Sequence, residues 1–275
     1  NNVDADSTPD VKSNGDAMYQ WSDGSGNTRH ATTGTASAAA AYEASAINGK
    51  GALRFAAGDT LDLNPTVSGV KSVFMVFKQT SDGSANTKLL GGDLVTSSAA
   101  EKVGLQREGG TGLIDSGISS SSYNVVSYEA AANAYALFVN GASGGTGTDS
   151  QALGALNKVG NNVPSIIAEI VAYDRVLPSL ARQKIEGYLA HKWGLESQLA
   201  SVHPYKIVLP TFGGNQEIVF QPLPDRQAGQ TVSLSVEASS GLSAFTFDSN
   251  DSTVVSISGS TVTALKLGTV TITAT

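Results

Sequence analysis

Short stretches with the composition of β-strands, separated by Gly, Asn and Asp, dominate the first 206 or so residues of this 275-residue chain. Residues 51–55, 72–77 and 133–139 combine β-branched, aromatic and aliphatic side chains, and the turn formers Asn140 and Gly141 follow the last of them. Strands at this spacing, without helical patterns between them, predict a sandwich or a barrel. Because residues 72–77 are apolar on both faces, we expect that strand to lie centrally, between two layers.

One segment, residues 179–193, has helical periodicity instead. Gly194 follows it as a natural C-terminal stop. A helix of about 15 residues is marginal alone, so we expect it to dock an apolar stripe on the β body as a cap. The stripe consists of Ala181, Ile185, Tyr188, Leu189 and Lys192, with Arg182, Lys184 and Glu186 expected on the solvent side.

The composition changes near residue 209. Pro and Gly punctuate residues 209–215, and about six alternating apolar and polar stretches follow, joined by short turns. This pattern predicts a small Ig-like β-sandwich over residues 209–275, after a first domain over residues 1–208. The first residues lack the basic start and apolar core of a signal peptide, and the last ones lie in a strand pattern. We therefore expect a piece of a longer chain with flanking domains.

Charge and cysteine content exclude several classes of function. The formal net charge is -7, only 15% of the residues are charged, and there is no cysteine. Without clustered Lys and Arg, no nucleic-acid partner is expected. Without cysteine, a disulfide framework, thiolate catalysis and Cys-ligated metals are excluded. Because no apolar run reaches the roughly 18 to 20 residues that span a bilayer, we expect no membrane insertion.

Two sets of segments resemble the signatures of bacterial laminin-G-like domains, which belong to the concanavalin A-like lectin/glucanase superfamily. The C-terminal signature covers residues 168–177, 181–195 and 203–206, and the N-terminal one residues 21–27, 30–32 and 51–55. At the helix start the family usually has a Ser or Thr cap and an acidic residue three positions on, where this chain has Pro178 and Ala181. The resemblance implies an all-β, concanavalin A-like jelly-roll sandwich with one C-terminal capping helix.

Residues 216–275 are similar to bacterial Ig-like repeats of large surface proteins, which usually serve as spacers. The resemblance lies in residues 218–225, 238–242, 247–251 and 268–273. Together the two resemblances imply an extracellular multidomain protein of the bacterial cell surface, either an adhesin or a polysaccharide-processing protein. We expect it to be monomeric.

Hydrolysis on such a sandwich needs two carboxylates facing each other, about 5 Å apart in a retaining enzyme, usually from alternating positions of one strand. No segment repeats Glu or Asp at i, i+2 and i+4. The nearest candidates, Asp59 with Asp62 and Glu169 with Asp174, have the spacing of strand ends or turns. The three histidines lack metal-ligand spacing. We therefore expect a non-catalytic protein.

Calcium is the one ion that the sequence suggests. Asp4, Asp6, Asp23 and Asn27 could offer hard oxygen ligands from loops, and a Gly-rich turn could add backbone carbonyls. The alternative is an Asx-turn, in which Asp23 bonds the backbone that follows it and holds the hairpin.

Sugar binding requires aromatic platforms and directional polar groups in a shallow groove. Each candidate has a structural alternative, because strand tyrosines usually pack in sheets and Arg107 can pair with Glu108. Trp21 and Trp193 lie in structural motifs and are expected in the core. The candidates are Asp93, Gln106, Arg107, Tyr123, Asn124 and Tyr128.

These observations favour a non-catalytic carbohydrate-binding or adhesion module of a secreted bacterial surface protein, which binds a glycan or cell-surface ligand and carries an Ig-like spacer. A structural or protein-binding domain without a sugar site is the first alternative. A polysaccharide-degrading enzyme is the second.

Overall fold

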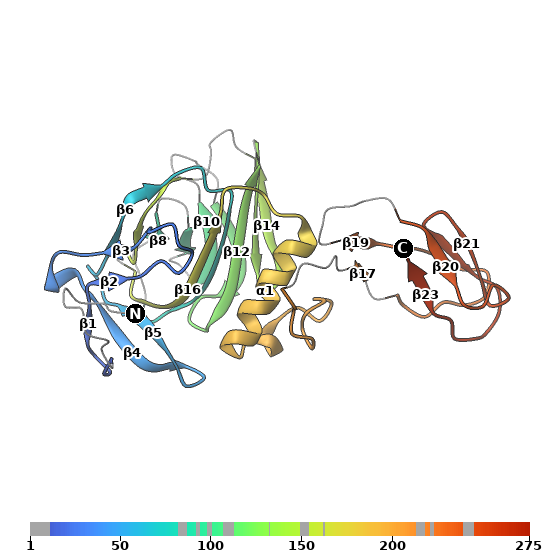
Figure 1. Ribbon diagram of the computed structural model, residues 1–275, viewed down its shortest axis with the longest axis horizontal. Helices are drawn as coiled ribbons and strands as arrows, with labels where there is room; N and C mark the ends of the chain where they lie inside the picture. Colours follow the sequence, from blue (N-terminus) through green and yellow to red (C-terminus); the bar gives the residue numbers. More distant parts are fainter. Residues whose placement is uncertain are drawn as a thin grey trace.

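Two eight-stranded antiparallel sheets form the larger part of the molecule (Figure 1). The computed structural model describes residues 12–81, 87–91, 94–97, 101–106, 113–131, 133–148, 154–161, 163–212, 218–220, 223–238 and 245–275. The first sheet, here called the helix-side sheet, has the strand order β1 (Ala17–Met18), β4 (Ala40–Ile47), β5 (Lys50–Phe55), β16 (Ser165–Tyr173), β7 (Ser72–Gln79), β12 (Asn124–Ala131), β13 (Ala134–Val139) and β14 (Ala142–Thr148). The second, here called the outer sheet, has the order β11 (Leu113–Ser119), β10 (Lys102–Gln106), β9 (Leu94–Ser97), β8 (Thr87–Leu90), β15 (Leu156–Val159), β6 (Leu61–Val67), β3 (Ala31–Thr32) and β2 (Gln20–Trp21).

The main core lies between these sheets and draws on both of them. Val73, Met75 and Phe77 of β7 point into it and are fully buried. Phe74 and Val76 point to the opposite face of β7 and belong to a second core under the helix. The strand is apolar on both sides because each side is covered, which confirms its predicted central position.

The single α-helix of the described residues, α1 (Ser179–Trp193), lies across the outer face of the helix-side sheet (Figure 1). Gly194 ends it in the left-handed conformation, with φ 69°, as predicted for a glycine stop. No side chain caps its N-terminus at Pro178. The predicted all-β sandwich with one capping helix is therefore confirmed. No helix in the described ranges is long and apolar enough to cross a membrane.

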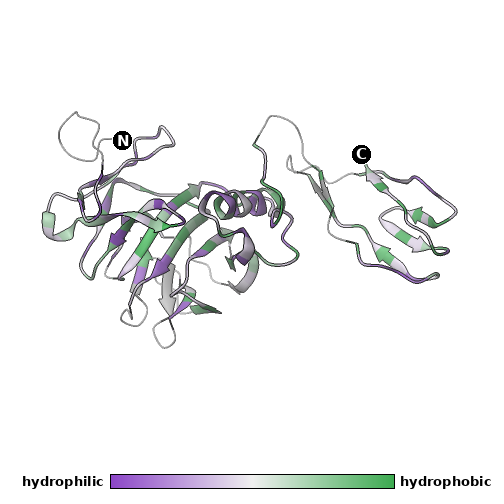
Figure 2. Ribbon diagram, turned by 90° about the horizontal axis from the view of Figure 1, so that it is seen from below, coloured by the Kyte–Doolittle hydropathy of each residue, from purple (hydrophilic) through white to green (hydrophobic). Residues whose placement is uncertain are grey.

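The predicted solvent face of α1 was wrong. Arg182, Lys184 and Glu186 are buried, and Figure 2 shows hydrophilic residues along much of this helix. Arg182 and Glu186 face the sheet, where Ser127 of β12 bonds Glu186 and the Arg182 guanidinium lies over the Phe138 ring. The chain after the helix, which includes the 3-10 turn η2 (Glu196–Gln198), folds back and brings His203 to the same carboxylate. Phe212 of this returning segment makes an edge-on contact with Tyr188, with ring centroids 5.4 Å apart.

Shorter strands form three small antiparallel sheets after residue 217 (Figure 1). They enclose a separate core of Leu234, Val254, Val255 and Val262. The Ig-like identity of this unit and the domain boundary at residue 209 stay predictions. The sheets consist of β17 (Ile218–Phe220) with β19 (Val236–Ala238), of β18 (Thr231–Ser233) with β22 (Thr261–Ala264) and β21 (Val255–Ser258), and of β20 (Phe247–Ser249) with β23 (Ile272–Ala274). In the large unit, a further 3-10 turn, η1 (Ala36–Ala38), precedes β4.

Candidate functional site

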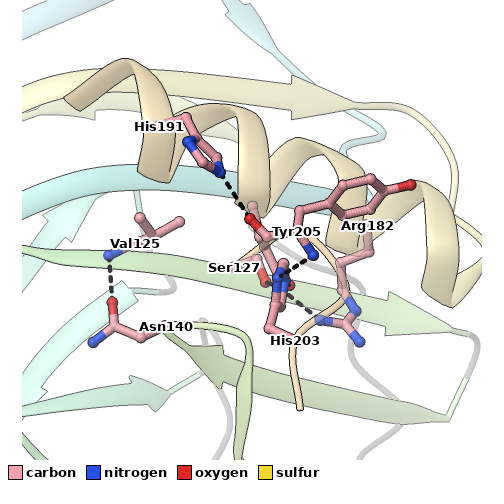
Figure 3. Close-up of polar contacts among 8 residues, drawn as sticks. Val125, Ser127, Asn140, Arg182, His191, His203 and Tyr205 are labelled. Carbon is pink, nitrogen blue, oxygen red and sulfur yellow. Dashed lines mark hydrogen bonds and ion pairs between the residues drawn. The ribbon is translucent and has the colours of Figure 1, made fainter. Parts of the chain in front are cut away.

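A buried polar cluster, consisting of Ser127, Arg182, Glu186 and His203, lies between α1 and β12 (Figure 3). Ser127 Oγ donates a hydrogen bond to Glu186 Oε1 over 2.5 Å, and Arg182 Nη1 lies 2.6 Å from the same oxygen. His203 Nε2 lies 3.3 Å from Glu186 Oε2. Three elements of the fold therefore meet at one carboxylate.

The hydrogen bonds also define the form of the His203 ring. Its Nδ1 accepts a bond from the backbone N–H of Tyr205 over 3.3 Å, so the proton of a neutral ring lies on Nε2 and points at Glu186. Burial alone would raise the pKa of Glu186. The His203 hydrogen bond, the Arg182 charge and the Ser127 hydroxyl outweigh burial, and the net pKa is below its ordinary value.

The cluster contains a serine, a histidine and a carboxylate, but it does not have the geometry of a catalytic triad. The carboxylate stands between serine and histidine, so the hydroxyl proton points at Glu186 and not at an imidazole base. Glu186 is only 1% exposed, which leaves no room for a substrate. The buried polar cluster therefore serves to clamp α1 and the returning segment onto the sheet.

Two of the predicted sugar-binding residues are buried in the fold, which corrects their predicted placement. Tyr128 is 1% exposed because it lies on the inner face of β12, in the core between the sheets. Asn124 donates from Nδ2 to the carbonyls of Ser119 and Ser122 and accepts from Asn140 at Oδ1. Its side chain holds turns together, and a ligand cannot use it.

The remaining predicted sugar-binding residues are not brought together by the described structure. Tyr123 is half-buried, and its hydroxyl donates to the carbonyl of Ala46 over 2.8 Å. Burial, followed by the Glu43 charge, raises the pKa of Tyr123 to about 12. Gln106 lies at the end of β10 in the outer sheet. Asp93 and Arg107 lie outside the described residues.

An open pocket of about 610 Å³ lies where strands β5 and β16 of the helix-side sheet separate from each other. The pairing of β16 with β5 stops at Ile167, although β16 continues to Tyr173 along β7. Among the described residues, no strand pairs with the β16 edge over residues 168–172, and this edge lines the pocket. The hairpin of β2 and β3 and the end of α1 frame the opening, here called the Trp21 pocket. Its lining includes Trp21, Asp23, Asn27, Arg29, Leu63, Val67, Leu90, Leu156, Val159, Glu169, Ile170, Ala172, Lys192 and Trp193.

The loop between β2 and β3 is held by Asp23. Its Oδ1 accepts the backbone N–H of Ser25 over 2.8 Å, and its Oδ2 accepts the backbone N–H of Arg29 over 3.0 Å. Burial would raise the pKa of Asp23, but these bonds outweigh it and the pKa is lowered. The Asx-turn interpretation is confirmed, and the turn fixes the position of Trp21 and Arg29 at the pocket wall.

A calcium site stays a prediction. Asp4 and Asp6 lie outside the described residues, and in the ranges that are described no three acidic or histidine side chains come close enough to hold a metal ion. Asn27 Nδ2 donates to Ser25 Oγ over 3.0 Å, within the same turn.

The opposite wall of the Trp21 pocket is built on Glu169. Its Oε1 accepts from Lys192 Nζ over 2.8 Å, and its Oε2 accepts from Trp193 Nε1 over 2.7 Å. Burial would lower the pKa of Lys192, but the Glu169 bond and charge raise it overall. Glu169 lies within β16 and not at a strand end, while Asp174 is exposed beside Arg175.

Both tryptophans pack on the core, as predicted, and both also line the pocket. Trp193 is 6% exposed in the core under α1, and Trp21 is half-buried against the core between the sheets. Sequence reasoning assigned them to structure alone. The available signal was Trp21 two residues before an Asp-Gly-Ser-Gly turn, because a rigid turn near an indole presents that ring at a surface.

A second pocket, also of about 610 Å³, lies in the small C-terminal unit. Its walls include Val254, Val255 and Val262, which are the core residues of that unit. This pocket is the gap between small sheets, and it offers fewer polar groups to a ligand than the Trp21 pocket.

The chain was compared with known proteins. No family model and no curated protein matches it. Among solved structures it is similar to domain 4 of AbnA, a GH43 extracellular arabinanase from Geobacillus stearothermophilus, with 14% identity, 54% of this chain and 80% of that chain covered, and a TM-score of 0.40. It is also similar to the CBM40 of the Ruminococcus gnavus IT-sialidase, with 20% identity, 46% and 92% covered, and a TM-score of 0.38. The Trypanosoma rangeli sialidase matches with 13% identity, 52% and 28% covered, and a TM-score of 0.38.

Proposed function

We propose that this chain is a carbohydrate-binding module and that its saccharide occupies the Trp21 pocket. The observation that carries the proposal is that one open pocket holds two indole rings and a strand edge with which no described strand pairs. Its volume of about 610 Å³ lies within the range of small-ligand sites.

The walls suit the two kinds of surface that a sugar ring presents. Trp21 and the apolar side chains of Leu63 and Val67 can pack against the C–H face of a sugar. The backbone of β16 beyond Ile167 offers N–H and C=O groups that are free of the β5 ladder, and sugar hydroxyls can both donate to and accept from them.

The carboxylates of the pocket support a non-catalytic role. Asp23 and Glu169 are the acids that line it, and both oxygens of each already accept hydrogen bonds from the protein. A glycosidase would need one of them to be a proton donor and the other a nucleophile or base. Neither is free for such a role.

The proposal extends to the kind of protein that contains this module and to the role of its C-terminal unit. We infer a monomeric module of a secreted bacterial surface protein, used in adhesion to glycans, in which the strands after residue 217 form an Ig-like spacer. The separate core of that unit supports a spacer, because it stands without residues of the larger sandwich.

A glycan array with the 275-residue chain, with and without calcium, tests the proposal. We expect retention of a defined set of saccharides and, for Trp21→Ala, a loss of at least about tenfold in affinity, since a buried aromatic contact is removed. Tyr19→Ala is the control, because Tyr19 is an exposed aromatic beside the same hairpin and does not line the pocket. If no saccharide is retained in either condition, the proposal is wrong.

The free edge of β16 favours one second candidate, a protein-binding role. An extended peptide could add itself to residues 168–172 as a strand. Phage-displayed peptides that bind the chain, combined with no retention on the array, would support this candidate.

A further inference from the structure

Four charged side chains line the Trp21 pocket, two acids and two bases: Asp23, Glu169, Arg29 and Lys192. What such a pocket can recognise depends on which of their hydrogen-bonding positions are still open, because a group already bonded inside the protein must give up that bond to contact a ligand.

The acceptor groups are already largely used. Asp23 Oδ1 accepts a hydrogen bond from the backbone N–H of Ser25. Its Oδ2 accepts from Ser25 Oγ and from the backbone N–H of Arg29. Glu169 spends one oxygen on Lys192 and the other on Trp193. These bonds occupy two or three of the roughly four acceptor positions of each carboxylate, so both acids are already largely engaged within the protein.

The pocket also contains donor groups whose N–H bonds are not all used within the protein. The backbone of Arg29 is anchored by Asp23, but its guanidinium is exposed and has no ion pair or hydrogen bond with any other described residue. Lys192 Nζ lies 2.8 Å from each oxygen of Glu169 and also has a hydrogen bond with Tyr188, so its donors are engaged within the protein. The unused polar capacity of the pocket's charged side chains is therefore greatest on Arg29.

We propose that the saccharide carries a carboxylate and that Arg29 binds it. This rests on the proposed function of the same pocket. A guanidinium presents two parallel N–H donors that match the two oxygens of a carboxylate, which makes it the side chain suited to this contact. The chain has a formal net charge of -7, so its overall field repels anions and an acidic sugar needs this local cation to be held.

The test uses an array of acidic oligosaccharides, each printed beside its carboxyl-reduced counterpart, which differs only in carrying a primary alcohol in place of the carboxylate. We expect the acidic form to bind about tenfold or more tightly than the reduced one, as for a charge-assisted hydrogen bond. Arg29→Gln removes that difference, and Arg29→Lys restores part of it. Raising the salt from about 50 to 500 mM weakens binding of the acidic form alone, because it screens exposed charges.

Arg226→Gln is the matched control, since it removes the same charge from an exposed arginine of the small unit that does not line the Trp21 pocket. Equal binding of acidic and reduced saccharides overturns this inference and leaves the proposed function standing. A preference that Arg29→Gln leaves unchanged overturns the role of Arg29. Absence of binding to every saccharide overturns the proposed function, and this inference with it.

Discussion

The buried polar cluster and the Trp21 pocket are made of the same parts, and they differ in what remains unbonded. Each has a carboxylate held by a cation and by further donors: Glu186 has Arg182, Ser127 and His203, and Glu169 has Lys192 and Trp193. The cluster is sealed, whereas the pocket is open and includes one cation, Arg29, that no described carboxylate neutralises. In both places the ion pairs stabilise the fold. In the pocket, we expect the unpaired Arg29 to contact the ligand.

The largest effect that would separate the two regions is on stability. Glu186→Gln removes the carboxylate that pairs directly with the buried Arg182 and leaves it only the charge interaction with Glu129, so we expect the free energy of unfolding in urea to fall by about 3 kcal/mol. The control is Glu43→Gln, which breaks the half-exposed pair with Arg54 and should cost less than about 1 kcal/mol. Equal losses for the two variants would contradict the view that the cluster is a clamp.

The second effect is on pH dependence, and it has the same origin. Because the pKa of Glu186 in the folded chain lies below its ordinary value of 4.5, the unfolded chain takes up the proton first as the pH falls. The stabilisation is complete above about pH 4.5 and is lost below it. Urea midpoints measured between about pH 7 and 3 should fall steeply at the acid end, and Glu186→Gln should flatten this fall. An unchanged slope in the variant would assign acid sensitivity to other carboxylates.

The third effect concerns the wall of the pocket. Asp23→Ala removes the acceptor of the Ser25 and Arg29 backbone N–H groups in an exposed turn, so we expect about 1 kcal/mol of lost stability. Saccharide affinity should fall as well, since the turn positions Trp21. Asp251→Ala is the matched control: it removes a similar turn acceptor, bonded to Thr253, in the small unit. Loss of affinity in the control would show that general destabilisation, and not the wall, is responsible.

The smallest effect is on ligand charge. Glu169→Gln removes one negative charge from the pocket and keeps the shape of the side chain. We expect acidic saccharides to bind about threefold more tightly to this variant, because the Lys192 charge is no longer neutralised. Titration calorimetry with the best array ligand measures it. Weaker binding would mean that the Glu169 bond to Trp193 matters more than its charge.

Much of the fold could be predicted from local pattern. The bounds of α1, its Gly194 stop and the two-sided burial of β7 all follow from periodicity and from glycine's conformational freedom. The solvent face of α1 could not be predicted, because helical periodicity does not show that Ser127 of β12 and the later residue His203 both meet Glu186.

The candidate site was largely beyond prediction. Tyr128 and Asn124 were chosen as polar or aromatic residues in strands, and they are buried by packing that no strand pattern reveals. Trp21 and Glu169, which line the pocket, were both considered from the sequence in other roles. Trp21 was expected in the core, and Glu169 was considered as a carboxylate for hydrolysis. Nothing in the chain links two residues so far apart in sequence, since their proximity depends on where β16 leaves β5.

The sequence by itself determined what short-range physics controls: the strand pattern and the one helix with its stop. It offered the Asx-turn at Asp23 as one of two interpretations, beside a calcium site. These local features depend on hydrogen bonds and steric limits within a few residues. Only the tertiary structure decided which charged side chains of the described residues form ion pairs within the protein and which do not. Burial and pairing come from segments such as residues 182–186, 127 and 203, which meet only when the chain is packed, and the same packing leaves Arg29 exposed at an open edge.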